Sequence, residues 1–318
     1  MKKEPLRFNK DGKFKIMLIG DLHEYYDMKS DNAAAKVDDT LNLLTKAVSE
    51  LEPDFVIYLG DNARAATESQ MRSIISRITY PVSVNEIPFD LVFGNHDREC
   101  DVPLKTQLKL YQEHDNCYAF NADDSISGCG NHNIIIKSHD GEKDMFNLWL
   151  IDSHNLYEDR SKSYYDVVHE DQLEWYKKTA KELAEKNGGK PIPSLVFQHI
   201  PAYGTVQGSN SYDGGWGTKK VYEILKDFPQ VINFSGHTHF SSRCPLTFHQ
   251  DKFTSLNDGG NLNCYIQKGI DIDGEMPEGT STLSEGMIVT VEDENNVGVR
   301  RIDGARNEEI GEQLNFSA

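Results

Sequence analysis

Aspartate, histidine and asparagine side chains recur in five short blocks of this sequence, each directly after an apolar run. The first three blocks read GDLH at 20–23, GDN at 60–62 and GNHD at 94–97. The last two read QH at 198–199 and GHTH at 236–239. Because ligand sites form at the carboxyl ends of parallel strands, we expect the five blocks to meet at one edge of a sheet.

The side chains of these blocks form a mixed oxygen and nitrogen donor set without a thiolate. Such a set suits iron, manganese, zinc or cobalt better than calcium. It is too large for one tetrahedral ion and about right for two ions that share a carboxylate. The candidate metal ligands are Asp21, His23, Asp61, Asn95, His199, His237 and His239.

A structural role explains any one block more easily than it explains all five. An aspartate after a strand is commonly a turn or N-cap residue, and the histidine near it is commonly on the surface. The block at 94–97 resists that explanation, because no turn requires asparagine, histidine and aspartate together. The five blocks in this order therefore predict a metal site.

The five blocks resemble those of the calcineurin-like metallophosphoesterase superfamily, in the same order along residues 20–239. The segments GNHDRE, NLWLIDSH, DQLEWYK and QHIPAY are similar to those of fungal Dcr2-type phosphatases and related plant purple-acid-phosphatase-like proteins. The purple acid phosphatases themselves have the pattern GDxxY, whereas this chain has Arg64 at the tyrosine position. The resemblance therefore implies a metal centre without the purple iron chromophore. In the fourth block, Gln198 replaces the usual glycine.

The resemblance assigns the candidate ligands to two metal positions that share Asp61. His96, which follows the asparagine ligand, would face the substrate and bind no metal. The first position would be held by Asp21, His23 and His239, and the second by Asn95, His199 and His237.

Phosphate ester hydrolysis needs a nucleophile, stabilised charge on the phosphoryl oxygens and a proton for the leaving group. A water that bridges two cations loses its proton near neutral pH, so a bridging hydroxide is the expected nucleophile. His96 is the candidate proton donor to the leaving oxygen, since an imidazole titrates near neutral pH. We expect Asp97 to orient His96, with helix N-capping as the alternative role of that carboxylate.

Three further side chains are candidate substrate contacts. Asn62 and Arg98 stand beside ligand blocks, with a turn role as the alternative for Asn62 and a surface ion pair as the alternative for Arg98. Tyr203 precedes a glycine-rich segment at 205–218 that we expect at the rim of the site. Packing in the core or at the rim is an equal alternative for Tyr203.

Short apolar runs alternate with helical patterns through the first two thirds of the chain. Runs at 14–19, 55–59 and 89–93 predict buried strands, and the apolar stripe along 31–51 predicts a helix. Alternation of strands and helices favours parallel strands with helical crossovers. Further strands are predicted at 134–136, 148–151, 195–197 and 231–234, and further helices at 70–78 and 171–186.

The last third of the chain changes to strand-like runs at 264–267, 286–291 and 297–302 separated by turn residues. We predict an α/β fold, a four-layer αββα sandwich of two mixed β-sheets flanked by helices. Residues 1–318 would form a single metallophosphoesterase domain, with 240–318 as a strand-rich part of the second sheet.

The acidic composition restricts the partners. With a formal net charge of −18, the protein repels the phosphate backbone of nucleic acids, and we expect no nucleic-acid footprint. Bound cations reverse the local field, so a phosphorylated small molecule or a phosphoprotein is the expected substrate. No apolar run is long enough for a membrane span or a signal-peptide core, which favours a cytoplasmic location.

The five cysteines, at positions 100, 117, 129, 244 and 264, form no CxxC pair. A structural zinc site is therefore not expected. We favour free thiols, with a disulfide between Cys117 and Cys129 as the alternative in an oxidising compartment.

Together these features predict a binuclear metal-dependent phosphoric ester hydrolase that acts on a phosphate mono- or diester, with iron, manganese or zinc as its metals. The alternative is a catalytically silent scaffold or binding protein of the same fold. Such a scaffold is expected to have lost a ligand or the equivalent of His96, and here every one of these positions is filled.

Overall fold

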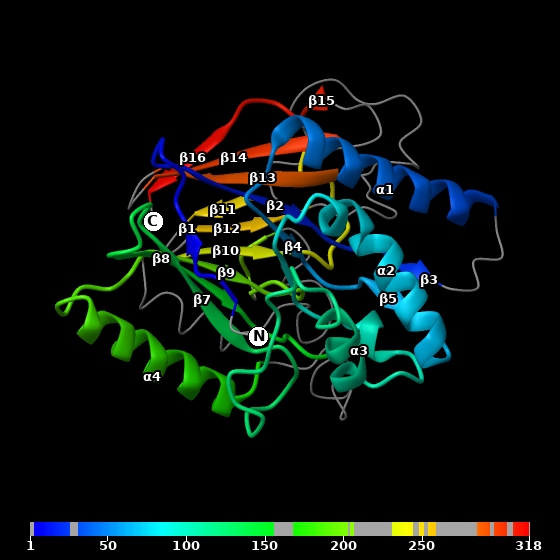
Figure 1. Cartoon of the computed structure of the whole chain (residues 1–318), viewed down its shortest axis with the longest axis horizontal. Coiled ribbons are helices and arrows are strands. Elements are labelled where there is room, and N and C mark those ends of the chain that lie inside the picture. Colours follow the sequence, from blue (N-terminus) through cyan, green and yellow to red (C-terminus); the bar gives the residue numbers. More distant parts are fainter. Residues whose placement is uncertain are drawn as a thin grey trace.

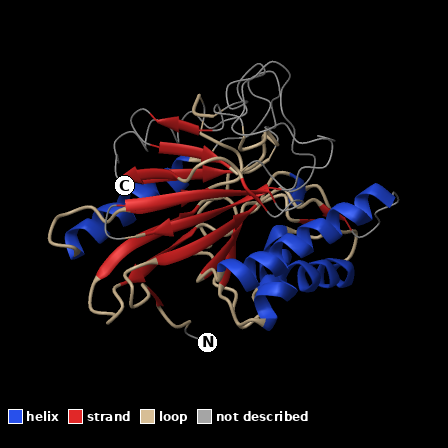
Figure 2. Ribbon diagram, turned by 90° about the horizontal axis from the view of Figure 1, so that it is seen from above, coloured by secondary structure: helices blue, strands red, loops and turns tan. Residues whose placement is uncertain are grey.

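The computed structural model of the chain describes residues 3–25, 31–155, 168–202, 204–206, 231–243, 248–250, 254–258, 285–292, 296–303 and 308–317. Two large β-sheets lie face to face in the middle of the molecule, and helices cover the outer face of each (Figures 1 and 2). We call the sheet that contains the first long strand sheet I and the other sheet II.

Sheet I is built around β2 (Phe14–Ile19). On one side β2 pairs in parallel with β4 (Phe55–Tyr58), and β4 pairs in parallel with β6 (Phe89–Leu91). On the other side β2 pairs antiparallel with β13 (Glu285–Val291). The sheet continues from β13 into β14 (Asn296–Asp303), which pairs antiparallel with both β15 (Glu308–Glu309) and β16 (Leu314–Ser317).

Sheet II has four neighbouring parallel strands at its centre. They are β8 (Asp144–Leu150), β9 (Ser194–Phe197), β10 (Val231–Ser235) and β12 (Thr254–Asn257). Antiparallel strands flank them, so sheet II is mixed as sheet I is. The flanking strands are β7 (His132–Lys137), with β1 (Leu6–Arg7) parallel to it, and β11 (Phe248–Gln250) at the other edge.

Side chains that alternate along the strands build the layers. In β2, Ile16 and Leu18 belong to the apolar core between the sheets, together with Phe197 of sheet II. Met17 and Ile19 face the opposite way and pack against the helices that cover sheet I. These are α1 (Asp31–Leu51), α2 (Glu68–Val84) and α3 (Leu104–Tyr111).

On the outer face of sheet II, Trp149 and Val196 pack against Leu173 and Tyr176 of α4 (Glu170–Lys186). Figure 1 shows α4 on one side of the strands and α1 to α3 on the other. The predicted four-layer αββα sandwich is therefore confirmed, with helices outside both mixed sheets.

The predicted strands and helices occur at the expected places, with ends that local chemistry sets. Helix α2 begins before the predicted residue 70 because Thr67 caps it, and Gln70 completes a capping box with Thr67. The predicted strand at 264–267 lies outside the described residues.

The prediction for residues 240–318 is wrong in one respect. The described strands of that part are divided between the sheets, because β11 and β12 extend sheet II whereas β13 to β16 complete sheet I beside β2. An antiparallel partner for β2 comes from the end of the chain, and no local pattern specifies that choice.

Two smaller predictions are also decided. Cys100, Cys117 and Cys129 are free thiols, so the disulfide considered between Cys117 and Cys129 is not formed, while Cys244 and Cys264 lie outside the described residues. In the part of the chain that the structure describes, no helix combines the length and the apolar character needed to cross a bilayer.

Candidate metal centre

The five sequence blocks follow five strands, β2, β4 and β6 of sheet I and β9 and β10 of sheet II. Within each sheet these strands run parallel to their neighbours in the set, so their carboxyl ends lie at the same edge. Six of the seven candidate ligands form close groups of possible metal-binding atoms there. The seventh, Asn95, is buried and precedes His96, whose amide N–H donates to Asp61.

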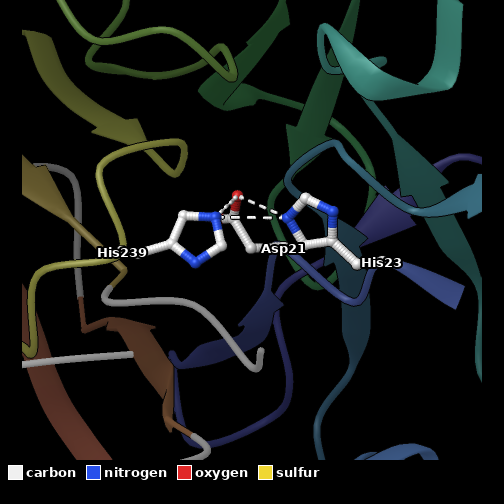
Figure 3. Close-up of side chains that lie close together, drawn as sticks. All are labelled: Asp21, His23 and His239. Atoms are coloured by element: carbon white, nitrogen blue, oxygen red, sulfur yellow. Dashed lines mark hydrogen bonds and ion pairs between the residues drawn. The ribbon is translucent and has the colours of Figure 1, made fainter. Parts of the chain in front are cut away.

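The first group consists of Asp21, His23 and His239, whose ligand atoms all lie within 4.8 Å of one another. The two imidazole rings approach the Asp21 carboxylate from opposite sides (Figure 3). His239 Nε2 lies 3.3 Å and His23 Nε2 3.8 Å from Asp21 Oδ1, and the two ring nitrogens are 3.2 Å apart. These are the residues predicted for the first metal position.

The second group consists of Asp61, His199 and His237, again with ligand atoms within 4.8 Å of one another. Asp61 Oδ2 lies 3.1 Å from His199 Nε2 and 3.7 Å from His23 Nε2 of the first group. Asp61 therefore stands between the two groups, as a bridging carboxylate must.

A third group, His23, Asp61 and His96, was not anticipated from the sequence. A ring nitrogen of His96 lies within 4.8 Å of the ligand atoms of the other two side chains. The His96 side chain is also 38% exposed, in contrast to the almost fully buried His23 and Asp61. His96 thus lies at the solvent side of the centre, where a group that meets the substrate is required.

The backbone at the centre is held in an unusual conformation. A positive φ is uncommon for residues other than glycine and persists only where the surrounding structure enforces it. Eight described non-glycine residues have a positive φ, and five of them are candidate ligands. Those five are Asp21, His23, Asp61, His237 and His239.

Contacts between the loops enforce this conformation. The amide of Asp21 donates to the carbonyl of Gly60 at 3.0 Å, and that of His23 donates to the carbonyl of Asp61 at 2.8 Å. Gly60 has a φ of +91°, and a Cβ there would lie 2.6 Å from Nδ1 of His199. Glycine is therefore required at this position both by the turn and by the imidazole beside it.

Two imidazoles are oriented through their Nδ1 atoms. His199 Nδ1 lies 2.8 Å from the carbonyl of Leu59, which can only accept, so Nδ1 donates and Nε2 is the ring nitrogen that faces the centre. His23 Nδ1 lies 3.1 Å from the hydroxyl of Tyr25, and its Nε2 also faces the centre. Such contacts fix the tautomer of a metal-binding histidine. Tyr25 was not predicted; the sequence signal was its place two residues after His23.

The ionisable side chains of the centre shift the pKa values of one another. Burial opposes ionisation of Asp21, but His239, His23 and His199 together outweigh it and hold the pKa of this carboxyl well below its usual range. Burial of Asp61 is likewise outweighed by His199 together with His23, and the pKa of Asp61 is lowered. Burial disfavours a charged His199, but Asp61, Asp21 and the carbonyl of Leu59 together outweigh it and raise the pKa of His199 to about 9. Burial and the charge of His199 lower the pKa of His237 to about 3, so this imidazole is neutral, as a metal-binding imidazole has to be.

The donor atoms fit two cations. Asp21 Oδ1 is buried and accepts no hydrogen bond from the described residues, although three imidazole nitrogens approach it at 3.3 to 4.0 Å. Asn95 Oδ1 is likewise buried without a hydrogen bond from the described part of the chain. Buried acceptors are normally satisfied, so these oxygens mark positions suited to cations. Carboxylate, amide and imidazole donors match transition metals.

The role predicted for Asp97 is wrong. This carboxylate points into the protein, where Oδ1 accepts from the amides of Asn62 and Ala63, both at 2.9 Å, and Oδ2 accepts from that of Gly94 at 2.7 Å. Burial, reinforced by the charge of Asp61, raises the pKa of Asp97 to about 7. Asp97 therefore ties two ligand loops together and is neither the partner of His96 nor an N-cap.

The partner of His96 is Glu99, whose Oε2 lies 2.6 Å from His96 Nδ1. The two residues belong to a 3₁₀ turn, η1 (His96–Arg98), which Glu99 closes. The sequence signal was their spacing of three residues, since side chains at i and i+3 eclipse in a 3₁₀ helix.

The candidate substrate contacts have different outcomes. Asn62 is buried and donates its side-chain amide to the carbonyl of Val92 at 3.1 Å, whereas its Oδ1 accepts no hydrogen bond from the described residues, so both roles considered for it stay predictions. Arg98 pairs with the buried carboxylate of Asp152, so its guanidinium is occupied and the pair is not at the surface. Tyr203 and most of the segment 205–218 lie outside the described residues.

A cavity of about 350 Å³ adjoins the centre. Tyr25 and Glu99, which contact His23 and His96, form part of its wall, together with Arg64 and Asp101. The Arg64 guanidinium lies 5.7 Å from the centre of the Tyr25 ring. Arg64, at the position of the purple-site tyrosine, therefore belongs to this cavity.

Comparisons with known proteins agree with the family resemblance of the five sequence blocks. The family model of the calcineurin-like phosphoesterases matches residues 14–241. A protein of Arabidopsis thaliana called "Probable inactive purple acid phosphatase 14" is 30% identical over 221 residues, which cover 62% of this chain and 55% of that protein. "Phosphatase DCR2" of Saccharomyces cerevisiae is 28% identical over 213 residues, which cover 60% of this chain and 35% of that protein.

Among solved structures, a purple acid phosphatase from yellow lupin (Lupinus luteus) seeds superimposes with a TM-score of 0.59 over 99% of this chain and 55% of its own. At 14% identity this likeness concerns the fold alone. The chain spans about half the length, or less, of the curated relatives it matches.

Proposed function

Because this chain belongs to the calcineurin-like phosphoesterase family, we propose that it is a binuclear metal-dependent hydrolase of phosphate mono- or diesters. The observation that carries the proposal is the convergence of six of the seven candidate ligands. Asp21, His23 and His239 on one side and His199 and His237 on the other meet around Asp61. Two bound cations best explain why so many buried metal-binding atoms surround one carboxylate.

Two transition-metal ions, when bound, supply an activated water and neutralise charge on the phosphoryl oxygens. The protein's own residues supply the rest. Asp61 lies between the two groups of candidate ligands and fixes their positions relative to each other. His96 lies at the solvent side of the centre. As the P–O bond to the leaving group breaks, an N–H bond of His96 breaks and the leaving oxygen keeps that proton. A second proton, from solvent water, then restores His96.

The substrate we propose is a phosphorylated small molecule or a phosphoprotein. The net charge of −18 disfavours a long polyanion such as DNA. The cavity of about 350 Å³ beside His96 and Glu99 is large enough for a small leaving group and carries both Arg64 and carboxylates. Iron, manganese and zinc are the proposed metals, and the cytoplasmic location stays a prediction.

A catalytically silent protein of the same fold is the second candidate. It is favoured by the names of three Arabidopsis relatives, each called a probable inactive purple acid phosphatase. It is opposed by the filled ligand set and by His96, and a further relative is called a phosphatase. The two candidates differ in turnover and agree in metal binding.

The experiment is reconstitution followed by a substrate panel. Metal-free protein is loaded separately with iron, manganese or zinc, and the metal content is measured by elemental analysis. We expect close to two ions per chain and hydrolysis of at least one aryl phosphate mono- or diester. Two bound ions with no turnover on any ester would identify the silent protein, and full activity without metal would overturn the mechanism.

A further inference from the structure

One short 3₁₀ turn and the residue that closes it direct four side chains in three directions. Asp97 points inward to the loop amides, and Arg98 reaches Asp152. His96 and Glu99, three residues apart, lie side by side because a 3₁₀ turn eclipses i and i+3. The amide of Glu99 also donates to the carbonyl of His96 at 3.1 Å, which closes the turn and fixes the two residues relative to each other.

The contact between the side chains is short and has a defined direction. His96 Nδ1 lies 2.6 Å from Glu99 Oε2. An ionised carboxylate can only accept, so Nδ1 of the imidazole donates. Nε2 is then the ring nitrogen that remains for the metal centre and the substrate. The ring itself lies edge-on to that of His23, with 5.1 Å between the centroids.

Glu99 occupies a different place from the metal ligands. It belongs to none of the close groups of metal-binding atoms found among the described residues. Its side chain is 30% exposed and forms part of the wall of the cavity beside the centre. Glu99 therefore reaches the substrate side of His96, whereas Asp97 is fully occupied on the protein side.

We propose that Glu99 is the positioning residue of His96. By accepting from Nδ1, it holds the ring with the Nε2–H bond directed toward the ester oxygen of the departing alcohol, which receives that proton. This inference rests on the proposed phosphoesterase function. It adds a residue that the sequence blocks did not assign, and it replaces Asp97 in the orienting role.

The kinetic test separates leaving groups that need a proton from those that do not. Wild type, Glu99→Gln and Glu99→Ala are compared on an aryl and an alkyl ester of the class that the wild type hydrolyses. We expect kcat on the alkyl ester to fall roughly 10- to 100-fold in Glu99→Ala, part of the roughly 10²–10⁴-fold that general acid catalysis contributes. The aryl ester, KM and the metal content should change little. Glu99→Gln keeps an acceptor oxygen and should be intermediate.

Asp101→Asn is the matched comparison, because it removes one carboxylate from the same cavity and leaves the pair of His96 and Glu99 in place. Its ratio of alkyl to aryl turnover should equal that of the wild type. Equal ratios in Glu99→Ala and wild type would overturn the proposal. The proposal would also be overturned if Asp101→Asn lost as much alkyl-ester turnover as Glu99→Ala does. The loss would then come from removing a negative charge from the cavity.

A double variant tests whether Glu99 acts through His96. Residues that act as one unit give non-additive losses. His96→Ala with Glu99→Ala should therefore be no slower on the alkyl ester than His96→Ala alone. A further loss of the size seen in Glu99→Ala would show an independent role for Glu99 and contradict positioning.

A spectroscopic test does not depend on activity. In zinc-loaded protein with ¹⁵N-labelled histidine, the Nδ1–H signal of His96 is assigned by its loss in His96→Ala. We expect this signal to be that of a strongly hydrogen-bonded proton in the wild type and in Asp101→Asn, and to shift or vanish in Glu99→Ala. An unchanged signal in Glu99→Ala overturns the proposal. If the wild type hydrolyses no ester, the proposed function fails, and this signal still decides the pairing.

Discussion

The amide nitrogen of His96 donates a hydrogen bond of 2.7 Å to Oδ1 of Asp61. The other oxygen of Asp61 lies 3.1 Å from His199 and 3.7 Å from His23. One carboxylate thus joins both halves of the metal centre to the turn that carries the candidate acid. A change at Asp61 is therefore expected to disturb metal binding and catalysis together.

Asp61→Asn should lose metal and abolish turnover. An asparagine keeps the shape but presents one neutral oxygen and one N–H₂ group, so it cannot bridge two cations. Elemental analysis and turnover of the best ester are measured after identical reconstitution. Asp144→Asn is the control, because it removes a carboxylate outside the centre. In the wild type Asp144 forms an ion pair with Lys137. Full metal content and full activity in Asp61→Asn would contradict the bridging role.

His96→Ala should retain both metals and lose turnover on poor leaving groups. The side chain stands at the solvent side of the centre and donates only its backbone amide to Asp61, which alanine also provides. We expect a decrease of roughly 10²–10⁴-fold on an alkyl phosphate and a much smaller one on an aryl phosphate. A variant as fast as the wild type on the alkyl ester would remove the acid role. Loss of one equivalent of metal would instead make His96 a ligand.

The layers of the fold could be predicted, and so could the position of the five blocks at one edge of the sheets, because both follow from local sequence patterns. The continuous apolar run of β2 predicts a strand that is buried on both faces, as its neighbouring residues Ile16 and Met17 are. Glycine-led turns then place polar side chains at the carboxyl ends of neighbouring parallel strands. The resemblance supplied the division of the ligands into two positions.

The contacts that depend on the direction of a single turn could not be predicted. Asp97 and Glu99 are both acidic and both near His96, and only the 3₁₀ geometry turns Asp97 inward and Glu99 toward the imidazole. The pairing of β13 with β2 was equally inaccessible. It joins Met287 to Leu18 across most of the chain, and no local pattern carries that information.

Asp97→Ala should destabilise the protein more than Asp97→Asn. Alanine leaves the amides of Asn62, Ala63 and Gly94 without their acceptor, at about 1–3 kcal/mol for each buried donor that finds no water. Asparagine keeps one acceptor oxygen, so the unfolding free energy of Asp97→Asn should lie between those of the wild type and Asp97→Ala. Urea unfolding of the metal-free proteins measures this order. If Asp97→Asn keeps wild-type stability and selectively slows the alkyl ester, then Asp97 and not Glu99 orients His96.

His114 should make stability depend on pH. Burial lowers the pKa of His114, with neighbouring Glu113 acting in the opposite direction, and Thr79 and Ser83 lie at 3.4 Å from its ring nitrogens. A lowered pKa in the folded state means that its contribution is present above the unfolded pKa of about 6.5 and is lost as pH falls. His114→Gln should therefore reduce the decline in unfolding free energy below about pH 6.5. Urea titrations at several pH values check this, and equal slopes in both proteins would contradict it.

Removal of the metals should lower the melting temperature of the wild type and leave that of Asp61→Asn unchanged. Ligands that bind only the folded protein add stability by mass action, about 2.7 kcal/mol at a free concentration of 100 times Kd. Without cations, Asp21 and Asp61 are two buried carboxylates facing each other across His199. Calorimetric scans before chelation, after it and after metal is restored measure the effect. Equal melting temperatures in all three scans of the wild type would show that the centre binds no metal under those conditions. A recovery on restoring metal that Asp61→Asn does not share would locate the stabilising ions at the shared carboxylate.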